Sequence, residues 1–95
     1  KDKNGETPLF KACESGNETL VKYLIKHGVK LYEKNFKGET ALFRACQYGN
    51  QNVVKCLIDL GVDIEQLNKD FNTPLHIASK YGQKEMVKYL IEQGA

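Results

Sequence analysis

The sequence predicts an all-α solenoid, and three observations support this fold class. The stretch 38–49 recurs 33 positions earlier and 33 positions later without a gap. Each copy carries apolar residues spaced as on one face of a helix. The glycines stand at matching places in the copies, where they can end a helix. A fixed period of this length is typical of stacked helix pairs, because one pair alone cannot bury its apolar face.

Length and composition fit one folded unit. The chain has 95 residues, of which 27% are charged and 41% hydrophobic, so it is not of the disordered class. We expect a single domain over 1–95 with repeats at 2–34, 35–67 and 68–95, and we expect it to be an excerpt of a longer array. The net charge of +2 is spread over the repeats, which does not favour nucleic-acid binding. No apolar run approaches the ~20 residues that span a bilayer, so membrane insertion is not expected.

A turn opens each repeat, at 2–5, 35–38 and 68–71. An Asp or Asn at its first position and a Gly at its fourth favour a tight turn, because Gly adopts positive φ without strain. Phe71 takes the place of this glycine in the third repeat. Two outcomes are open here: the third turn is rearranged, or Phe71 covers apolar surface.

The first helix of each repeat is short. It is expected at 8–15, 41–48 and 74–81, with the hydroxyls of Thr7, Thr40 and Thr73 as N-caps that accept from free N–H groups. Pro8 and Pro74 suit the first helical position, where a missing N–H costs nothing. A glycine follows each helix and ends it.

The second helix follows after this glycine, at 18–27, 51–60 and 84–93. Its apolar residues recur at i, i+1, i+4 and i+5, as in Leu20, Val21, Leu24 and Ile25, which makes one apolar stripe. Another glycine ends each of these helices, and loops resembling β-turns join one repeat to the next.

The residues that carry chemistry form no catalytic pattern. His76 occupies a repeated slot and is interpreted as a structural hydrogen-bonding residue. The histidines and cysteines lack metal-ligand spacing, no serine is paired with a histidine base, and no phosphate-binding glycine loop is present. We therefore expect no enzyme activity, no metal and no cofactor.

The three cysteines are interpreted as buried thiols. Cys13 and Cys46 share a slot that holds Ser79 in the third repeat, which indicates a need for a small side chain. Packed helices lie about 10 Å apart, which exceeds the ~7 Å Cα limit of a disulfide, but whether Cys13 and Cys46 could be bridged stays open. Free thiols favour a reducing, intracellular location, cytoplasmic or nuclear.

The third repeat carries a recognisable signature. Residues 73–78 read Thr-Pro-Leu-His-Ile-Ala, Gly82 follows, and 86–95 complete the second helix. A 33-residue unit of a turn and two helices with this signature resembles the ankyrin repeat, and the resemblance covers essentially the whole chain. It departs at Phe10 and Phe43, which replace the usual His, and at Tyr32 and Glu65, which replace a frequent Asn. Bonds that depend on those residues are not expected here.

The resemblance implies a protein–protein interaction module with a concave binding face made of turn tips and first helices. On this face the exposed positions differ between copies even where their flanks agree. Those proposed to bind a protein partner are Phe36, Lys37, Glu39, Gln47, Tyr48, Lys69, Asp70, Asn72, Lys80 and Tyr81.

Phe36, Tyr48 and Tyr81 are hypothesised to form an aromatic ridge, because aromatic anchors concentrate binding energy. The lysines among the ten would favour a partner with acidic residues around an apolar centre.

Four other interpretations stay open. Tyr48 and Tyr81 could merely cover the groove between helices. The chain could be a spacer in a longer array without a partner of its own. Uncapped terminal repeats could drive end-to-end self-association. An artificial consensus design is disfavoured by the uneven departures at Tyr32, Cys56 and Phe71.

Overall fold

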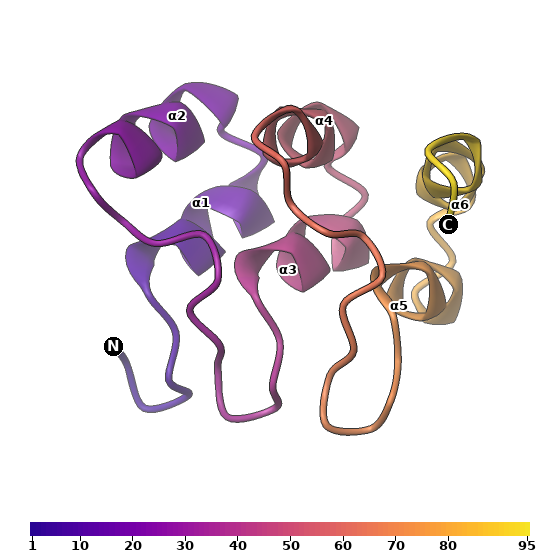
Figure 1. The fold of residues 1–95 in the computed structure, drawn as a ribbon, viewed down its shortest axis with the longest axis horizontal. Coiled ribbons are helices and arrows are strands. Elements are labelled where there is room, and N and C mark those ends of the chain that lie inside the picture. The colour runs from indigo at the N-terminus through magenta and orange to yellow at the C-terminus, as the bar shows by residue number, and fades with distance from the viewer.

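A computed structural model describes all 95 residues and has six helices and no strand. The first helices α1, α3 and α5 lie side by side in a middle layer, with α2, α4 and α6 on one side of them and the turns on the other (Figure 1). The expected all-α solenoid of helix pairs is confirmed. The helices are α1 Pro8–Ser15, α2 Glu18–Lys26, α3 Ala41–Gln47, α4 Gln51–Asp59, α5 Pro74–Lys80 and α6 Lys84–Glu92.

Five of the six helices end one residue earlier than the sequence predicts. The residue expected to close each of them is instead its C-cap, as Tyr48 is for α3 and Leu60 for α4. A glycine with positive φ follows each C-cap, for example Gly49 at +69°. This left-handed residue turns the chain away and leaves the preceding residue outside regular helical geometry.

The three threonines occupy the N-cap positions as expected, but only Thr73 caps through its side chain. His76 N donates to Thr73 Oγ1 at 3.3 Å, and Thr73 N donates to His76 Nδ1 at 2.9 Å. The expected hydroxyl caps at Thr7 and Thr40 are wrong. There the third helical residue is a buried phenylalanine that cannot return a hydrogen bond, and its amide bonds the threonine carbonyl instead.

Thr40 and Thr7 therefore differ from Thr73 in what their hydroxyls do. Thr40 Oγ1 donates to Gln66 Oε1 at 2.8 Å. Thr7 Oγ1 is buried without a partner. His76 is thus a structural residue that completes a capping box, and the Phe substitutions remove this box from two of the three repeats.

The turn of the third repeat keeps the geometry of the other two. Phe71 has φ +64°, close to the +77° of Gly5 and Gly38, and its amide donates to Asn68 O at 3.0 Å as the glycine amides do in their turns. Asn68 Oδ1 also accepts from the amides of Asp70 and Asn72, both at 2.9 Å. These bonds fix the turn whatever residue fills the fourth position. Phe71 is 77% exposed, so neither open outcome for it is right.

The core is one continuous cluster that runs through all three repeats. α1 packs on α3 and α3 on α5, and the second helices cover them. Phe10 and Phe43 are fully buried, so packing replaces the hydrogen bonds of a histidine at these slots. The apolar stripes of the second helices supply Val21, Val53, Val54, Leu57, Met86 and Leu90.

Polar side chains tie the start of α4 and the start of α6 to the preceding repeat. Asn50 Nδ2 donates to the carbonyls of Cys13 and Glu14 at 2.7 and 2.9 Å. One repeat later, Gln83 Nε2 donates to Gln47 O at 2.9 Å. Gly49 has φ +69°, which favours glycine, and a Cβ there would lie 2.5 Å from Gln83 Oε1 and displace the end of that side chain.

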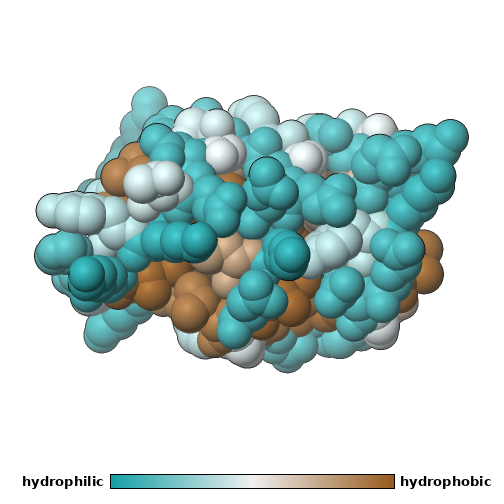
Figure 2. Space-filling model, turned by 90° about the horizontal axis from the view of Figure 1, so that it is seen from above, coloured by the Kyte–Doolittle hydropathy of each residue, from teal (hydrophilic) through white to brown (hydrophobic).

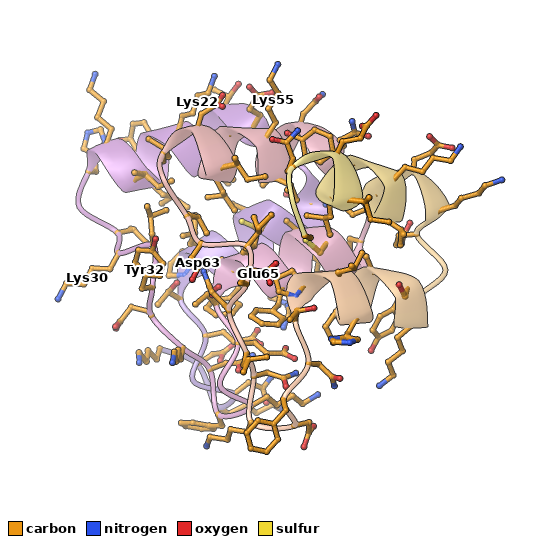
Figure 3. The ribbon with its side chains drawn as sticks, turned by 45° about the vertical axis from the view of Figure 1, so that its right-hand side comes forward. Lys22, Lys30, Tyr32, Lys55, Asp63 and Glu65 are labelled. Atoms are coloured by element: carbon orange, nitrogen blue, oxygen red, sulfur yellow. The ribbon has the colours of Figure 1, made fainter.

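The connecting loops add one bond that the sequence did not indicate. Tyr32 Oη donates to Gly61 O at 3.3 Å and links the loop after α2 to the end of α4. Figure 3 shows Tyr32, Asp63 and Glu65 on these loops, while Lys22 and Lys55 extend outward from the second helices. None of the six helices is both long and apolar enough to span a membrane.

Replacing Phe71 by Gly is predicted to stabilise the protein. The left-handed conformation costs a residue with a Cβ about 1–2 kcal/mol, and glycine avoids this cost. Glycine also loses more backbone entropy on folding, which reduces the gain in stability by roughly 0.5–1 kcal/mol. The free energy of unfolding should rise by about 0.5–1 kcal/mol in urea melts. Phe36→Gly, on the same kind of turn but one position after its Asn, is the control and should not stabilise. A Phe71→Gly protein no more stable than the parent would show that position 71 is unstrained.

Candidate functional site

A hollow of about 360 Å³ lies in the angle between the turns and the first helices. We call it the concave hollow. It draws on all three repeats, because Asn4 comes from the first, most of the wall from the second and Tyr81 from the third. Its lining residues are Asn4, Glu6, Asn35, Phe36, Lys37, Glu39, Arg44, Gln47, Tyr48 and Tyr81.

Backbone hydrogen bonds between successive turns hold the outer wall of the hollow. Phe36 N donates to Asn4 O, and one repeat later Lys69 N donates to Lys37 O, both at 3.0 Å. Inside each turn the side-chain oxygen of the first residue, an Asp or an Asn, accepts hydrogen bonds from two backbone amides. Asn35 Oδ1, for example, accepts from the amides of Lys37 and Glu39. The turn tips are therefore spaced by regular bonds rather than by their variable side chains.

The turn asparagines Asn35 and Asn68 orient two carboxylates of the hollow. Asn35 Nδ2 donates to Glu6 Oε2 at 3.1 Å, and Asn68 Nδ2 donates to Glu39 Oε2 at 2.9 Å. Glu6 is buried and Glu39 is half-buried. The two bonds are one repeat apart, so Glu6 and Glu39 occupy equivalent positions on successive repeats.

Arg44 is the most constrained charge of the hollow. Its guanidinium pairs with Glu6 Oε2 and, at 2.9 Å, with Glu14 Oε1, and it lies over the Phe10 ring at 5.8 Å from the centroid. Its side chain is only 16% exposed. Burial lowers the pKa of Arg44, but the two carboxylates outweigh burial and raise that pKa above its ordinary value, so the cation persists.

Sequence reasoning missed Arg44 as a residue of the site. Its slot holds Lys11 in the first repeat and Ile77 in the third. A first-helix slot whose residue differs in all three repeats was the available signal. Asn35 was also missed, because it was read only as a turn residue.

The structure brings the three aromatic residues of the predicted ridge to one hollow. Phe36, Tyr48 and Tyr81 are 67%, 46% and 48% exposed, and all three line the concave hollow. About half of each tyrosine therefore faces solvent. Their role in binding stays a prediction.

The other seven predicted binding residues divide into two groups. Lys37, Glu39 and Gln47 line the concave hollow. Lys69, Asp70, Asn72 and Lys80 lie outside its wall, on the third turn and at the end of α5. The Lys80 ammonium stands over the Tyr81 ring at 5.6 Å from the centroid, which shows that this ring is accessible to a cation.

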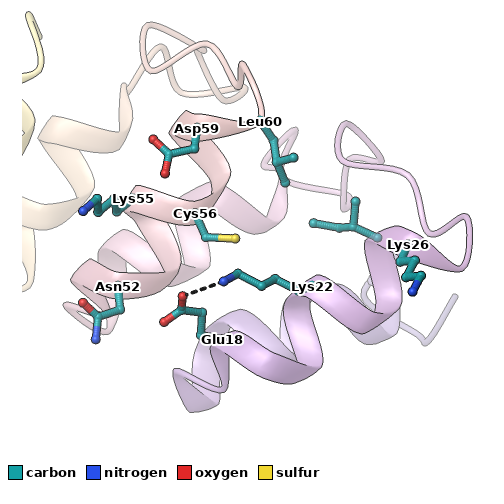
Figure 4. Close-up of a pocket in the computed structure, with 9 residues that line it drawn as sticks. Glu18, Lys22, Lys26, Asn52, Lys55, Cys56, Asp59 and Leu60 are labelled. Carbon is teal, nitrogen blue, oxygen red and sulfur yellow. Dashed lines mark ion pairs between the residues drawn. The ribbon is translucent and has the colours of Figure 1, made fainter.

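A second, larger hollow of about 650 Å³ lies on the opposite side, between α2 and α4. Figure 4 shows Cys56 on its wall with the sulfur toward Lys22, whose ammonium pairs with Glu18 at 3.1 Å. Ile25 and Leu60 are its other apolar residues. Viewed onto the second helices, hydrophobic residues show as a band between hydrophilic ones (Figure 2).

All three cysteines are buried and unbridged. Burial raises the pKa of Cys13 to about 12, with a smaller contribution from Cys56, and burial likewise raises the pKa of Cys46 to about 12. Burial also raises the pKa of Cys56. Such thiols stay protonated near neutral pH and are poor nucleophiles. No group of three or more His, Cys, Asp or Glu side chains is placed to hold a metal ion.

The chain is a helical repeat protein, because it consists of stacked helix pairs with a hollow between the turns and the first helices. The pattern of the family described as "Ankyrin repeats (3 copies)" matches residues 1–68 and again residues 32–95. The chain therefore belongs to the ankyrin repeat family. Ankyrin repeats are generally protein–protein interaction modules, and the family is typically non-catalytic. No curated protein matches this chain in sequence.

Replacing Arg44 by Met is predicted to destabilise the protein. The change leaves the buried Glu6 carboxylate without its cation, and we expect a loss of about 2–3 kcal/mol, below the roughly 3–5 kcal/mol of a fully buried pair because Glu14 is partly exposed. Urea melts measure this loss. Lys11→Met, in the same slot on an exposed lysine, is the control and should change little. Equal effects of the two changes would contradict the assigned role of Arg44.

The cysteines are predicted to react in a fixed order. Cys56 lines the α2–α4 hollow, whereas Cys13 and Cys46 are fully buried, so a thiol reagent at pH 8 should modify Cys56 first and the others only on unfolding. Peptide mapping after timed labelling measures this order, and equal rates at all three would contradict it.

The stability of the protein is predicted to fall at alkaline pH. Folding raises the pKa of Cys13 and Cys46 from 9.0 to about 12, so the contribution of these thiols to the free energy of unfolding should be fully present below pH 9 and be lost as pH rises from 9 toward 12.

Proposed function

We propose that this chain recognises a partner protein through the concave hollow and the turn tips beside it. The observation that carries the proposal is the hollow itself, in which three exposed aromatic side chains from two repeats meet on a hydrogen-bonded frame. Large aromatic side chains supply contact area at little entropic cost, and binding energy tends to concentrate in them. The frame favours binding because little has to be ordered when the partner arrives.

The charges around the aromatic ridge support a partner with acidic flanks. Lys37, Lys69 and Lys80 are exposed and form no ion pair within the chain. Lysines at the rim of an interface attract acidic residues and raise the association rate, an effect that salt weakens. The ten predicted residues thus remain our proposed binding surface, with Arg44 and Asn35 as supports of its geometry.

We infer an intracellular module without catalytic activity, since the free, protonated thiols suit a reducing compartment and the ankyrin repeat family is typically non-catalytic. We further infer that the three repeats form one domain that stacks with additional repeats in a longer array. A second copy stacked end to end is the alternative to those additional repeats.

A capture experiment tests the proposal. The chain and a Phe36→Ser, Tyr48→Ser, Tyr81→Ser variant serve as baits in cell lysate, with circular dichroism to show equal folding. The control is Leu20→Ser, Tyr23→Ser, Ile91→Ser, which removes exposed apolar residues from α2 and α6, away from the hollow. A protein held by the parent and the control but lost by the ridge variant is the expected result. Equal capture by all three baits would overturn the proposal and favour a spacer role.

A further inference from the structure

Glu39 occupies the same position as Glu6 on the next repeat but lacks the cation that Glu6 has. Glu6 is paired with Arg44, which comes from the following repeat. Arg44 and Ile77 occupy the same slot in successive repeats, 33 positions apart. Ile77 therefore takes the place beside Glu39 that Arg44 has beside Glu6. Glu39 forms no ion pair in the structure, and its only side-chain bond is from Asn68 Nδ2 to Oε2, which leaves Oε1 without a protein donor.

The surroundings of Glu39 repeat those of Glu6 in a milder form. Beside Arg44 lie the Glu14 carboxylate and the Phe10 ring. The equivalent residues one repeat later are Gln47, a neutral acceptor that lines the hollow, and the buried Phe43. The rings of Tyr48 and Tyr81 also line the hollow. The Lys80 ammonium lies over the Tyr81 ring, so this ring can bind a cation. Carboxylate, amide oxygen and ring faces are the groups that bind a guanidinium.

The local charge also favours a cation. Arg44 pairs with Glu6 and Glu14, and the Lys11 ammonium also lies 4.0 Å from Glu14, so both of these carboxylates have a cationic partner. Arg44 is already paired with two carboxylates, which leaves Lys37 at the exposed turn tip as the one unpaired cation of the wall. Glu39 is therefore the carboxylate of the hollow that has no ion-pair partner.

We propose that the concave hollow takes an arginine side chain of the partner protein, with its guanidinium on Glu39 and its stem against Tyr48 and Tyr81. The chain itself supplies a partial template, because the Arg44 guanidinium pairs with Glu6, the equivalent of Glu39, and lies over an aromatic ring, that of Phe10. The inference rests on the proposed function and specifies its partner: an arginine at the centre, with acidic residues around it that meet Lys37, Lys69 and Lys80.

The test is an amide-shift NMR titration with N-acetyl-arginine methylamide as the probe and N-acetyl-norleucine methylamide as its uncharged counterpart. We expect the arginine compound to shift the amide signals of Glu39, Gln47 and Tyr81, and the norleucine compound to shift them much less. Glu39→Gln keeps an acceptor for Asn68 and should weaken binding about tenfold, since a hydrogen bond to a charged group is lost. Glu65→Gln, on an exposed loop away from the hollow, should bind as the parent does.

A second variant places the cation within the chain. Ile77→Arg is predicted to pair with Glu39 as Arg44 pairs with Glu6, and to abolish the probe-induced shifts while melting cooperatively. No shift with the parent, equal shifts from the norleucine compound, or full binding to Glu39→Gln would each overturn the inference. A third titration uses N-acetyl-lysine methylamide, and an affinity equal to that of the arginine compound would overturn the guanidinium assignment.

These outcomes are separable from those of the capture experiment. Loss of a captured protein on changing the aromatic ridge, with no arginine binding, would sustain the proposed function and reject this inference. Arginine binding that depends on Glu39, together with equal capture of the protein by the parent and the ridge variant, would sustain the arginine site and overturn the aromatic ridge as the surface that holds the partner.

Discussion

Burial of one apolar stripe against the neighbouring repeat is the constraint on which this molecule depends. The stripes of α2, α4 and α6 cannot be covered by the short first helices of their own repeats alone, so each repeat is stable only when stacked. The resulting core runs unbroken from Leu9 to Leu90. This explains why Phe10 and Phe43 are accepted at slots where the family usually has histidine: the positions are fully buried, and apolar packing there serves the same stack.

Stacking fixes distance, but polar side chains fix register. Asn50 and Gln83 reach back to carbonyls of the preceding repeat, and Asn35 and Asn68 reach back to its glutamates. Buried or half-buried polar groups are costly unless they are bonded, so each of these contacts favours one alignment of neighbouring repeats over the alternatives. The close approach of Gln83 to Gly49 is part of the same alignment.

The candidate site arises where this repetition is imperfect. Successive repeats offer the same backbone frame, and the side chains placed on it differ. The frame holds Glu6 and Glu39 alike, but Arg44 neutralises one and Ile77 leaves the other without a cation. Thr73 and His76 complete a capping box that the phenylalanines exclude elsewhere. Specific chemistry on a repeat protein is therefore decided by departures from the repeat, because the shared positions serve the stack.

The sequence by itself determined the period, the helix pairs, the stacked all-α fold and the family, because helix signals and apolar stripes are local and are repeated three times. It also indicated which variable positions would share a face, and Phe36, Tyr48 and Tyr81 do line one hollow. Only the tertiary structure decided the partners of long polar side chains. The pairing of Arg44 with Glu6 joins residues 38 apart, and the hydroxyl of Thr7 is left without the kind of partner that Gln66 provides for Thr40. The turn at Phe71 was likewise decided in three dimensions, since the hydrogen bonds of Asn68 outweigh the preference of a single residue.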